Sequence, residues 1–408
     1  EAFFQLSGAG HEATAALAPH LHEDDWLHCH YRDRALLIAR GLPIRTFFDN
    51  LLCKDHAPGR GRRMSPFMSD PALNILSMVT PTGNNALQSV GVAAAVKDQP
   101  GNPIVYNGIG DGTTQQGEFL EACAEASRSE LPVLFVIQDN KWAISTQTTQ
   151  KTFYSLPDGR ATEFCGIPIC YADGRNVVEA DEVFRETVAG MRQDRKPRII
   201  VLEMERLASH TNADDQRIYR DEQDLAEARA NSDPITILQQ RLLAMDFNEA
   251  DLQVMDSQIR DQIDAAQNEA VDGPEPLTTK TAKQPLNVEL THPSRQQSGT
   301  ESGPQLTMRE ALRNVLHHHL HNDQRVTLFG EDIEDPKGDV FGVTKGLSTE
   351  FPSRVRNAPL SESTIIGTSI GRALAGERPV AFLQFADFMP LAFNQIASEL
   401  STIHWRSD

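Results

Sequence analysis

The sequence predicts an α/β fold built on mostly parallel sheets, and three observations in its middle support this prediction. An apolar stretch at residues 105–109 ends at Gly110-Asp111-Gly112, where the two glycines tolerate the backbone angles of a turn. Residues 118–127 then carry apolar side chains at three- and four-residue spacing, the pattern of a helix that packs on a sheet. A continuously apolar run follows at 131–137, and such runs are typical of parallel strands that are buried on both faces.

Two parallel strands joined by a helix bring the residues that follow them to one edge of the sheet. Asp111 follows the first strand, and Asn140 follows the second. Ligands bind at this carboxyl edge of open α/β sheets. Carboxylate and amide oxygens suit Mg²⁺, which keeps its other sites for phosphate oxygens and water. Each residue alone would more often be a turn residue or a helix cap. The pair together predicts a site that holds a diphosphate through a metal ion.

This stretch resembles the thiamine-diphosphate motif of thiamine-dependent enzymes, which begins Gly-Asp-Gly and closes on an Asn at about this distance. Its flanks, Gly117-Glu118-Phe119 and Ala143-Ile144-Ser145, resemble the α part of the decarboxylating first component of 2-oxo-acid dehydrogenase complexes. The resemblance implies that Asp111 and Asn140 bind Mg²⁺ and that the backbone oxygen of Trp142 is the third protein ligand. It also implies that Gly110, Gly112 and Ile144 take part in binding thiamine diphosphate.

Four further residues gain a role only through the resemblance. Tyr31 and Arg32 lie in a polar cluster at 28–33, which unaided would be the start of a surface helix. Arg206 and His210 lie in a polar loop after an apolar strand, where a lone His is more often solvated than catalytic. The resemblance implies that Tyr31 and Arg32 bind the diphosphate, and a guanidinium can hold two phosphate oxygens at once. It likewise implies that Arg206 binds the diphosphate and that His210 belongs to the active site.

A second α/β unit is predicted from residue 307 onwards. A helix at 307–321 begins with Thr307 and Glu310 at the spacing of a capping box, and an apolar strand follows at 325–330. Segments at 307–311, 330–332, 359–362 and 378–388 resemble the β subunit of the same enzymes. The resemblance implies that Glu362 is the catalytic residue that binds N1′ of the aminopyrimidine, and that Phe388 lines the pyrimidine or substrate pocket. Unaided, Glu362 would be an acidic residue at a helix N-terminus.

The resemblance narrows the fold class to two thiamine-diphosphate-binding-fold domains, one for the diphosphate and one for the pyrimidine. We expect an α-subunit-like diphosphate- and Mg-binding domain at residues 1–245 and a β-subunit-like pyrimidine-binding domain at 306–408. Between them, residues 246–305 predict an acidic helix and a linker rich in Pro, Thr, Gln and Ser. The chain begins at Glu1, without Met, and ends within a predicted helix, so we expect a fragment with an incomplete β part.

The composition limits the class of partner. The 408 residues carry a formal net charge of −19, which argues against nucleic acid and anionic membranes, since both select basic surfaces. No apolar run reaches the ~20 residues that a membrane span needs. The five cysteines are an odd number without paired short spacings, which favours reduced thiols and a cytoplasmic location over a disulfide framework or a zinc site.

The resemblance implies a function: the oxidative decarboxylation of a 2-oxo acid with thiamine diphosphate and Mg²⁺, and reductive acylation of the lipoyl group of a dihydrolipoyl transacylase partner. The His210 loop and the β part favour a branched-chain 2-oxo acid, as in 3-methyl-2-oxobutanoate dehydrogenase, with pyruvate and acetoin as alternatives. A homo-oligomer is expected. The other class is a non-catalytic homologue kept for assembly. One departure concerns the diphosphate: Gln138 stands where branched-chain relatives have an Arg that reaches phosphate.

Overall fold

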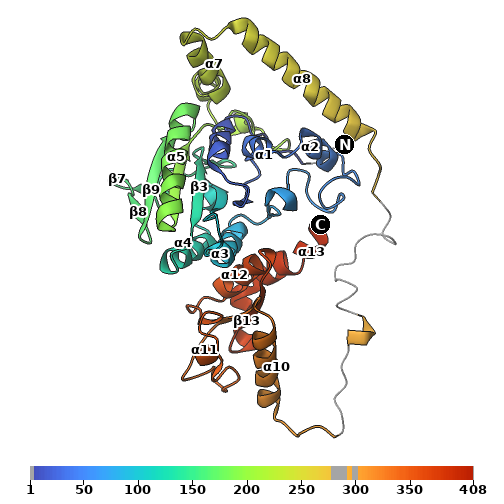
Figure 1. The fold of residues 1–408 in the computed structure, drawn as a ribbon. Helices are drawn as coiled ribbons and strands as arrows, with labels where there is room; N and C mark the ends of the chain where they lie inside the picture. Colours follow the sequence, from blue (N-terminus) through green and yellow to red (C-terminus); the bar gives the residue numbers. More distant parts are fainter. Residues whose placement is uncertain (1–3, 277–291, 296–301, 408) are drawn as a thin grey trace.

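A six-stranded sheet organises the first part of the chain in the computed structural model, which describes residues 4–276, 292–295 and 302–407 (Figure 1). Its strand order is β1-β2-β3-β10-β9-β8, and all neighbours are parallel except β8 and β9. The strands are β1 (Trp26–His28), β2 (Val105–Gly110), β3 (Val133–Asp139), β8 (Glu163–Phe164), β9 (Ile167–Asp173) and β10 (Arg198–Glu203).

Helices cover both faces of this sheet, because its central strands are apolar on both sides. One core joins alternate strand residues such as Tyr106, Leu134 and Ile200 to η1 (Glu12–His20), α1 (Arg34–Arg40) and α5 (Val177–Asp194). The other core joins the opposite residues, such as Val105, Phe135 and Ile199, to α3 (Asn84–Val96) and α4 (Gly117–Arg128). The side chains of a strand alternate between its faces, so one apolar run supplies both cores.

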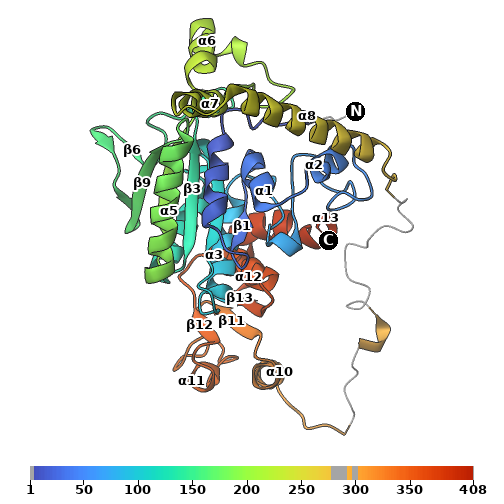
Figure 2. The same ribbon diagram turned by 45° about the horizontal axis from the view of Figure 1, so that its top comes forward.

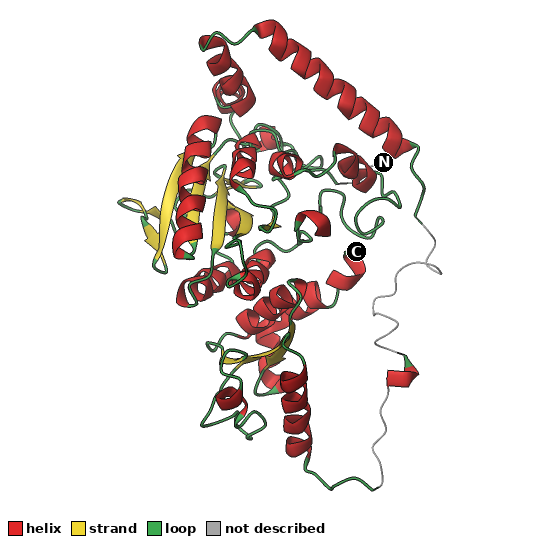
Figure 3. Ribbon diagram, viewed as in Figure 1, coloured by secondary structure: helices red, strands yellow, loops and turns green. Residues whose placement is uncertain are grey.

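A smaller parallel sheet, ordered β12-β11-β13, forms the second part (Figure 3). Its strands are β11 (Val326–Gly330), β12 (Val355–Asn357) and β13 (Arg378–Phe382), and its helices are α10 (Met308–Asn322), α11 (Leu347–Glu350) and α12 (Glu362–Leu374). Leu320, Leu328 and Val355 lie in one small core of this unit, and Ile366, Ile370 and Ala392 form another.

The two parts pack directly on each other where α12 lies beside α3, as Figures 1 and 2 both show. Glycines permit this close approach. A Cβ added to Gly91 of α3 would lie 2.1 Å from the Thr368 carbonyl oxygen, and one added to Gly371 of α12 would lie 1.9 Å from the Gln88 carbonyl oxygen. The pairing of an α-like and a β-like unit therefore occurs within one chain in this structure.

The remaining elements connect or extend these units, and none of the helices among the described residues is long and apolar enough to span a bilayer. The helices are α2 (Ile44–Leu51), α6 (Glu222–Asn231), α7 (Pro234–Ala244), α8 (Glu249–Val271) and α13 (Ile403–Arg406). The short strands are β4 (Trp142–Ala143), β5 (Thr146–Gln147), β6 (Ser155–Leu156) and β7 (Gly159–Arg160). The tighter turns are η2 (Pro71–Leu73), η3 (Asp111–Thr113), η4 (Gln216–Ile218), η5 (Pro293–Arg295) and η6 (Ala386–Ala392), and η7 (Gln395–Leu400) is a π-helix.

The structure confirms the predicted α/β class with parallel sheets. The predicted strand–helix–strand stretch is β2, α4 and β3, and Thr307 and Glu310 form the predicted capping box at α10. The predicted acidic helix is α8, while most of the predicted linker, at 277–291 and 296–301, lies outside the described residues. A helix, α1, does begin directly after residues 28–33, with Asp33 at its N-cap. The unaided interpretation of these residues as part of the surface is wrong, because His28 ends β1 and Arg32 is buried.

Candidate functional site

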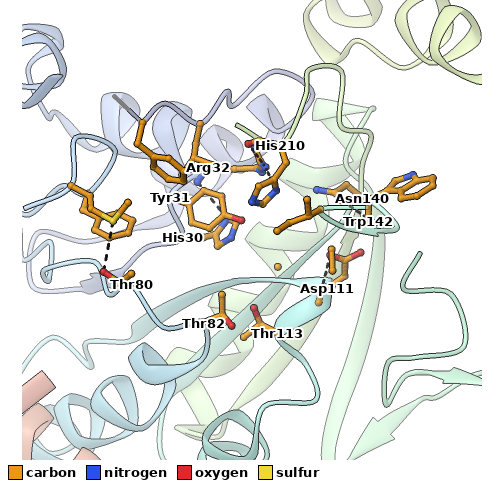
Figure 4. Close-up of a pocket in the computed structure, with 18 residues that line it drawn as sticks. His30, Tyr31, Arg32, Thr80, Thr82, Asp111, Thr113, Asn140, Trp142 and His210 are labelled. Carbon is orange, nitrogen blue, oxygen red and sulfur yellow. Dashed lines mark hydrogen bonds between the residues drawn. The ribbon is translucent and has the colours of Figure 1, made fainter. Parts of the chain in front are cut away.

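The carboxyl edge of the first sheet carries the loops that form the candidate site. Gly110 at the end of β2 pairs with Gln138 near the end of β3, so the residues just beyond these strands lie side by side. Asp111 and Asn140 face one cavity of about 320 Å³ there (Figure 4). The cavity is lined by Phe4, Leu6, His30, Tyr31, Arg32, Met64, Phe67, Thr80, Thr82, Gly110, Asp111, Gly112, Thr113, Asn140, Trp142, Ala143, Ile144 and His210.

Asp111 and Asn140 are both buried at the wall of this cavity. The Asp111 carboxylate accepts hydrogen bonds from the Thr148 hydroxyl at 2.6 Å and from the Gly112 N–H at 2.9 Å. Burial raises the pKa of Asp111 to about 6, and the neighbouring Asp139 acts in the same direction. A cation beside such a carboxylate favours its ionised form. Asn140 accepts the N–H of Trp142 at its Oδ1, 3.1 Å away.

The oxygens around Asp111 fit a hard divalent cation. Asp111, Asn140 and Trp142 all line the cavity, so the fold brings together the three residues that the sequence predicts as Mg²⁺ ligands. They offer a carboxylate, an amide and a backbone carbonyl, which is a donor set suited to Mg²⁺. No group of three or more His, Cys, Asp or Glu side chains within the described ranges is arranged to hold a metal ion.

Arg206, which the sequence assigns to the diphosphate, does not line the cavity. Its guanidinium is buried behind the cavity wall, where it donates to the Ile144 carbonyl oxygen at 2.9 Å and to the Tyr219 hydroxyl at 2.8 Å. Ile144 lines the cavity in the left-handed region, with φ 56°, a conformation that is rare for a β-branched residue. Arg206 thus braces a strained part of the wall.

Tyr31, Arg32 and His210 come together on the opposite side of the cavity (Figure 4). Arg32 is buried and donates to Nδ1 of His210 at 3.1 Å and to its carbonyl oxygen at 3.2 Å. Tyr31 meets the His210 ring edge-on, with ring centroids 6.1 Å apart. Burial and the adjacent Arg32 and Arg206 lower the pKa of His210 to about 4. His210 is therefore neutral at pH 7, with Nδ1 as an acceptor and Nε2 as the remaining donor.

The residues predicted from the β-like part, Glu362 and Phe388, are not among those that line this cavity. Glu362 is half-buried in the first turn of α12, beside Glu331. The adjacent Ser361 donates to Glu121 at 2.6 Å, which ties the start of α12 to the helix that follows Gly110-Asp111-Gly112. Phe388 lies in η6, edge-on to Phe385 and partly exposed.

Sequence reasoning missed the part that several residues play in this site, and it noted Gln138 only as a departure from branched-chain relatives. His11, Asp33 and Gln138 are buried behind Asn140 and joined by hydrogen bonds. Burial, and then Arg32, lower the pKa of His11 to about 3, while burial raises the pKa of Asp33 to about 7. The apolar lining from Phe4, Leu6, Met64 and Phe67 was also missed. Single residues in separate segments leave no periodic pattern, so no local signal in the sequence marked them.

Comparison with protein families identifies the two parts of the chain. The family model described as "Dehydrogenase E1 component" matches residues 2–278, most of the chain. The chain belongs to this family. The model described as "Transketolase, pyrimidine binding domain" matches residues 304–407. The chain therefore joins an α-type and a β-type part of a thiamine-diphosphate-dependent 2-oxo acid dehydrogenase E1 component, and both parts have the thiamine-diphosphate-binding fold.

Curated relatives match one part or the other. The chain is 27% identical to "Pyruvate dehydrogenase E1 component subunit alpha-3, chloroplastic" of Oryza sativa subsp. japonica over 257 residues, 60% of each protein. It is 26% identical to "2-oxoisovalerate dehydrogenase subunit alpha" of Bacillus subtilis (strain 168) over 272 residues, 66% of this chain and 81% of the relative. It is 44% identical to "2-oxoisovalerate dehydrogenase subunit beta" of the same organism over 100 residues, 24% of this chain and 30% of the relative.

These matches define the family but not one substrate, because α-type relatives named for pyruvate and for 2-oxoisovalerate are equally similar, at 27% identity. The chain spans about half to two thirds of the length of three α-type relatives named for pyruvate or for 2-oxoisovalerate. Its five cysteines are free in the structure.

Proposed function

We propose that the chain binds thiamine diphosphate through Mg²⁺ in this cavity and acts in the oxidative decarboxylation of a 2-oxo acid. The convergence of Asp111, Asn140 and Trp142 on one cavity carries this proposal, because these residues come from two strand ends and offer three hard oxygens. In the proposal Gly110, Gly112 and Ile144 contact the cofactor from the same edge. Tyr31 and Arg32 bind the diphosphate from the opposite wall.

Thiamine diphosphate, when bound, supplies the nucleophilic carbon and the electron sink that decarboxylation of a 2-oxo acid needs. The chain supplies position and charge. Arg32 is held by the Ser7 carbonyl oxygen and by His210, so its guanidinium is oriented before an anion arrives. His210, neutral and with Nε2 free to donate, is placed to hydrogen-bond an oxygen of the substrate. Glu362 is proposed to share a proton with N1′ of the pyrimidine.

A branched-chain 2-oxo acid is the proposed substrate. Beside His210 and Tyr31, the cavity is walled by the apolar side chains of Phe4, Leu6, Met64 and Phe67. An apolar acyl chain gains about 0.8 kcal/mol for each methylene that it buries against such a wall. The measurement is kcat/KM for 3-methyl-2-oxobutanoate and for pyruvate. We expect kcat/KM to be about tenfold or more higher for 3-methyl-2-oxobutanoate than for pyruvate. A higher kcat/KM for pyruvate would contradict the proposed substrate and place the chain with the relatives named as pyruvate dehydrogenases.

The proposed acyl acceptor is the lipoyl group of a dihydrolipoyl transacylase. We also propose a homo-oligomer as the assembly, and a cytoplasmic location, which the free cysteines support. The domain limits, with an α-like unit at 1–245 and a β-like unit at 306–408, belong to this proposal.

Calorimetric titration of the chain with thiamine diphosphate, with and without Mg²⁺, tests the proposal. Asp111→Asn should abolish the Mg²⁺ dependence of binding, because an amide replaces the only carboxylate of the predicted ligand set. Asp25→Asn is the matched control, since Asp25 is also fully buried but pairs with Arg192, 2.5 Å away. That variant should lose stability and keep its Mg²⁺ affinity. An unchanged titration for Asp111→Asn would reject the metal site.

Glu362→Gln separates catalysis from binding. The variant should retain Mg²⁺-dependent binding of thiamine diphosphate but exchange the C2 proton of the bound cofactor far more slowly. NMR of the bound cofactor in D₂O measures this exchange rate. Glu121→Gln is a control on the helix that contacts the start of α12, and it should leave proton exchange near the rate of the unaltered chain. Equal loss of binding and exchange in Glu362→Gln would give Glu362 a structural role instead.

A further inference from the structure

A chain of buried polar side chains lies behind Asn140 and has no part in the proposed chemistry. Asn140 Nδ2 is 3.2 Å from Nε2 of His11, and Nδ1 of His11 is 2.8 Å from Oε1 of Gln138. The Gln138 amide nitrogen is 2.5 Å from Oδ1 of Asp33. His11, Gln138 and Asp33 are each at most 1% exposed, so water does not compete for these hydrogen bonds.

The direction of every hydrogen bond in this chain follows from its far end. Asp33 accepts the hydroxyl of Tyr106 at 3.0 Å and the N–H of His30 at 2.6 Å, and in its ionised form both of its oxygens only accept. The amide nitrogen of Gln138 therefore faces Asp33, and its amide oxygen faces His11. Because an amide oxygen only accepts, Nδ1 of His11 carries the proton. The neutral ring then presents a lone pair at Nε2 towards Asn140.

The lone pair of His11 selects one of the two orientations of the Asn140 amide. The amide nitrogen must face His11, so Oδ1 is turned away from His11, and it accepts the N–H of Trp142, another residue that lines the cavity, at 3.1 Å. In the flipped orientation an oxygen would meet the lone pair of His11, and a nitrogen would meet the Trp142 N–H. Both hydrogen bonds would be lost in a buried site, where an unsatisfied polar group is costly.

We propose that His11 is a positioning residue, which, through the relay Asp33–Gln138–His11, fixes the Asn140 amide with its oxygen towards the metal. The inference deepens the proposed function and rests on it, since it gives a ligand of the proposed Mg²⁺ site its orientation. It also accounts for Gln138 at the position where an Arg was expected, because an Arg has no acceptor atom and cannot receive the Nδ1 proton of His11.

The first experiment compares two substitutions of His11. His11→Leu replaces the imidazole with an apolar side chain of similar size and removes both hydrogen bonds. We expect Mg²⁺ affinity in the presence of thiamine diphosphate to fall about 10- to 100-fold. His11→Gln can accept from Asn140 with Oε1 and donate to Gln138 with Nε2. Its Mg²⁺ affinity should stay within about threefold of the unaltered chain, because a terminal amide supplies both a donor and an acceptor. Calorimetry of Mg²⁺ binding is the measurement, and circular dichroism checks the fold.

A histidine at the other end of the helix that His11 precedes serves as the matched control. His20 at the end of η1 contacts Asp181 at 2.8 Å, away from the site, and His20→Leu should leave Mg²⁺ affinity unchanged. A folded His11→Leu protein that binds Mg²⁺ as tightly as the unaltered chain would overturn the inference. Equal losses in His11→Leu and His11→Gln would also overturn it, because the site would then depend on the shape of the imidazole and not on its hydrogen bonds.

The tautomer of His11 gives a second readout that does not depend on the variants folding. In ¹⁵N-labelled protein the imidazole of His11 should be neutral with the proton on Nδ1, and a proton on Nε2 would overturn the inference. This readout also separates the two proposals. An Nδ1 proton together with no Mg²⁺-dependent cofactor binding by the unaltered chain would reject the proposed function, whereas the wrong tautomer with normal Mg²⁺ binding would reject the relay alone.

Discussion

Single residues at this site owe their chemistry to burial. Asp111, His210 and Asp33 each depart from their ordinary pKa, and loss of hydration is the largest cause in every case. Burial raises the pKa of the two carboxyl groups and lowers that of the imidazole, since it disfavours the charged form of each. Asp111 and His210 line the cavity, so a cation or an anion that binds there would change their protonation equilibria.

Buried histidines also make the stability of the fold depend on pH. His28, which does not line the cavity, is the residue chosen to measure this effect. Burial lowers the pKa of His28 to about 4, and Nε2 of its ring lies 3.0 Å from the Ser77 carbonyl oxygen. The unfolded chain takes up this proton near pH ~6.5 while the folded chain does not, so stability falls as pH drops from ~6.5 towards the folded pKa. Between pH 7.5 and pH 5 this group should therefore remove about 2 kcal/mol from the free energy of unfolding.

The measurement is urea unfolding at both pH values for the unaltered chain and for His28→Gln. The glutamine keeps a donor for Ser77 but does not titrate, so the variant should lose about 2 kcal/mol less than the unaltered chain on acidification. The same pH dependence in both proteins would show that His28 is already protonated or exposed at pH 5.

At the scale of elements, the contact between α3 and α12 depends on backbone approach at glycines. Gly91 and Gly371 each face a carbonyl oxygen of the other helix at a distance that excludes a side chain. The contact brings Ser361, at the start of α12, to Glu121 of α4. Since α4 follows Asp111 in the chain, this helix pair determines how Glu362 stands relative to the sheet edge that carries Asp111.

Gly371→Ala should therefore destabilise the contact between the two parts. Its Cβ would meet the Gln88 backbone at 1.9 Å, and such overpacking typically costs about 1–3 kcal/mol. Gly190→Ala in α5 is the control, because the atom nearest to its added Cβ is 4.0 Å away. That control should gain roughly 0.5–1 kcal/mol, as expected for Ala in place of Gly within a helix. Thermal unfolding of both variants is the measurement. Equal stability of the Gly371→Ala and Gly190→Ala variants would contradict the role of the helix contact.

At the scale of the whole molecule, one chain contains both the α-like and the β-like part, and the two parts contact each other. Besides α3 and α12, polar contacts join the parts: Gln395 donates to Glu118 at 2.5 Å, and Asn84 donates to Glu399 at 3.0 Å. The Arg62 guanidinium donates to the Trp405 carbonyl oxygen at 2.7 Å and lies over the Trp405 ring. These contacts are independent of the covalent connection between residues 276 and 302.

A chain cut in this connection should therefore stay associated. A specific protease site inserted at residues 283–284 would allow cleavage after folding, and the two fragments should elute together in size-exclusion chromatography. The same cut in the Gly371→Ala chain should release the fragments more readily, because the helix contact is weakened. Complete separation of the fragments from the unaltered chain would show that the connection, and not the interface, holds the two parts together.

Part of the site could be predicted because its signals are local. The strand, turn and helix around Asp111 each follow from apolar spacing and from glycines, and the capping box at Thr307 depends on residues three apart. Parallel pairing of β2 and β3 then places Asp111 near Asn140, as the connection by one helix requires. The resemblance to thiamine-dependent enzymes added the roles that patterns do not carry.

The sequence by itself therefore determined the α/β class and the two-part organisation, because the spacing of apolar residues and short motifs depend on neighbouring positions. It also predicted Asp111 and Asn140 as metal ligands, and the resemblance added Trp142. Only the tertiary structure decided that Arg206 supports Ile144 from behind the cavity, that Phe4 and Met64 line it, and that His11 faces Asn140 across 129 positions of sequence. Such contacts depend on how separate segments pack, and the identity of each residue alone does not specify its distant partner.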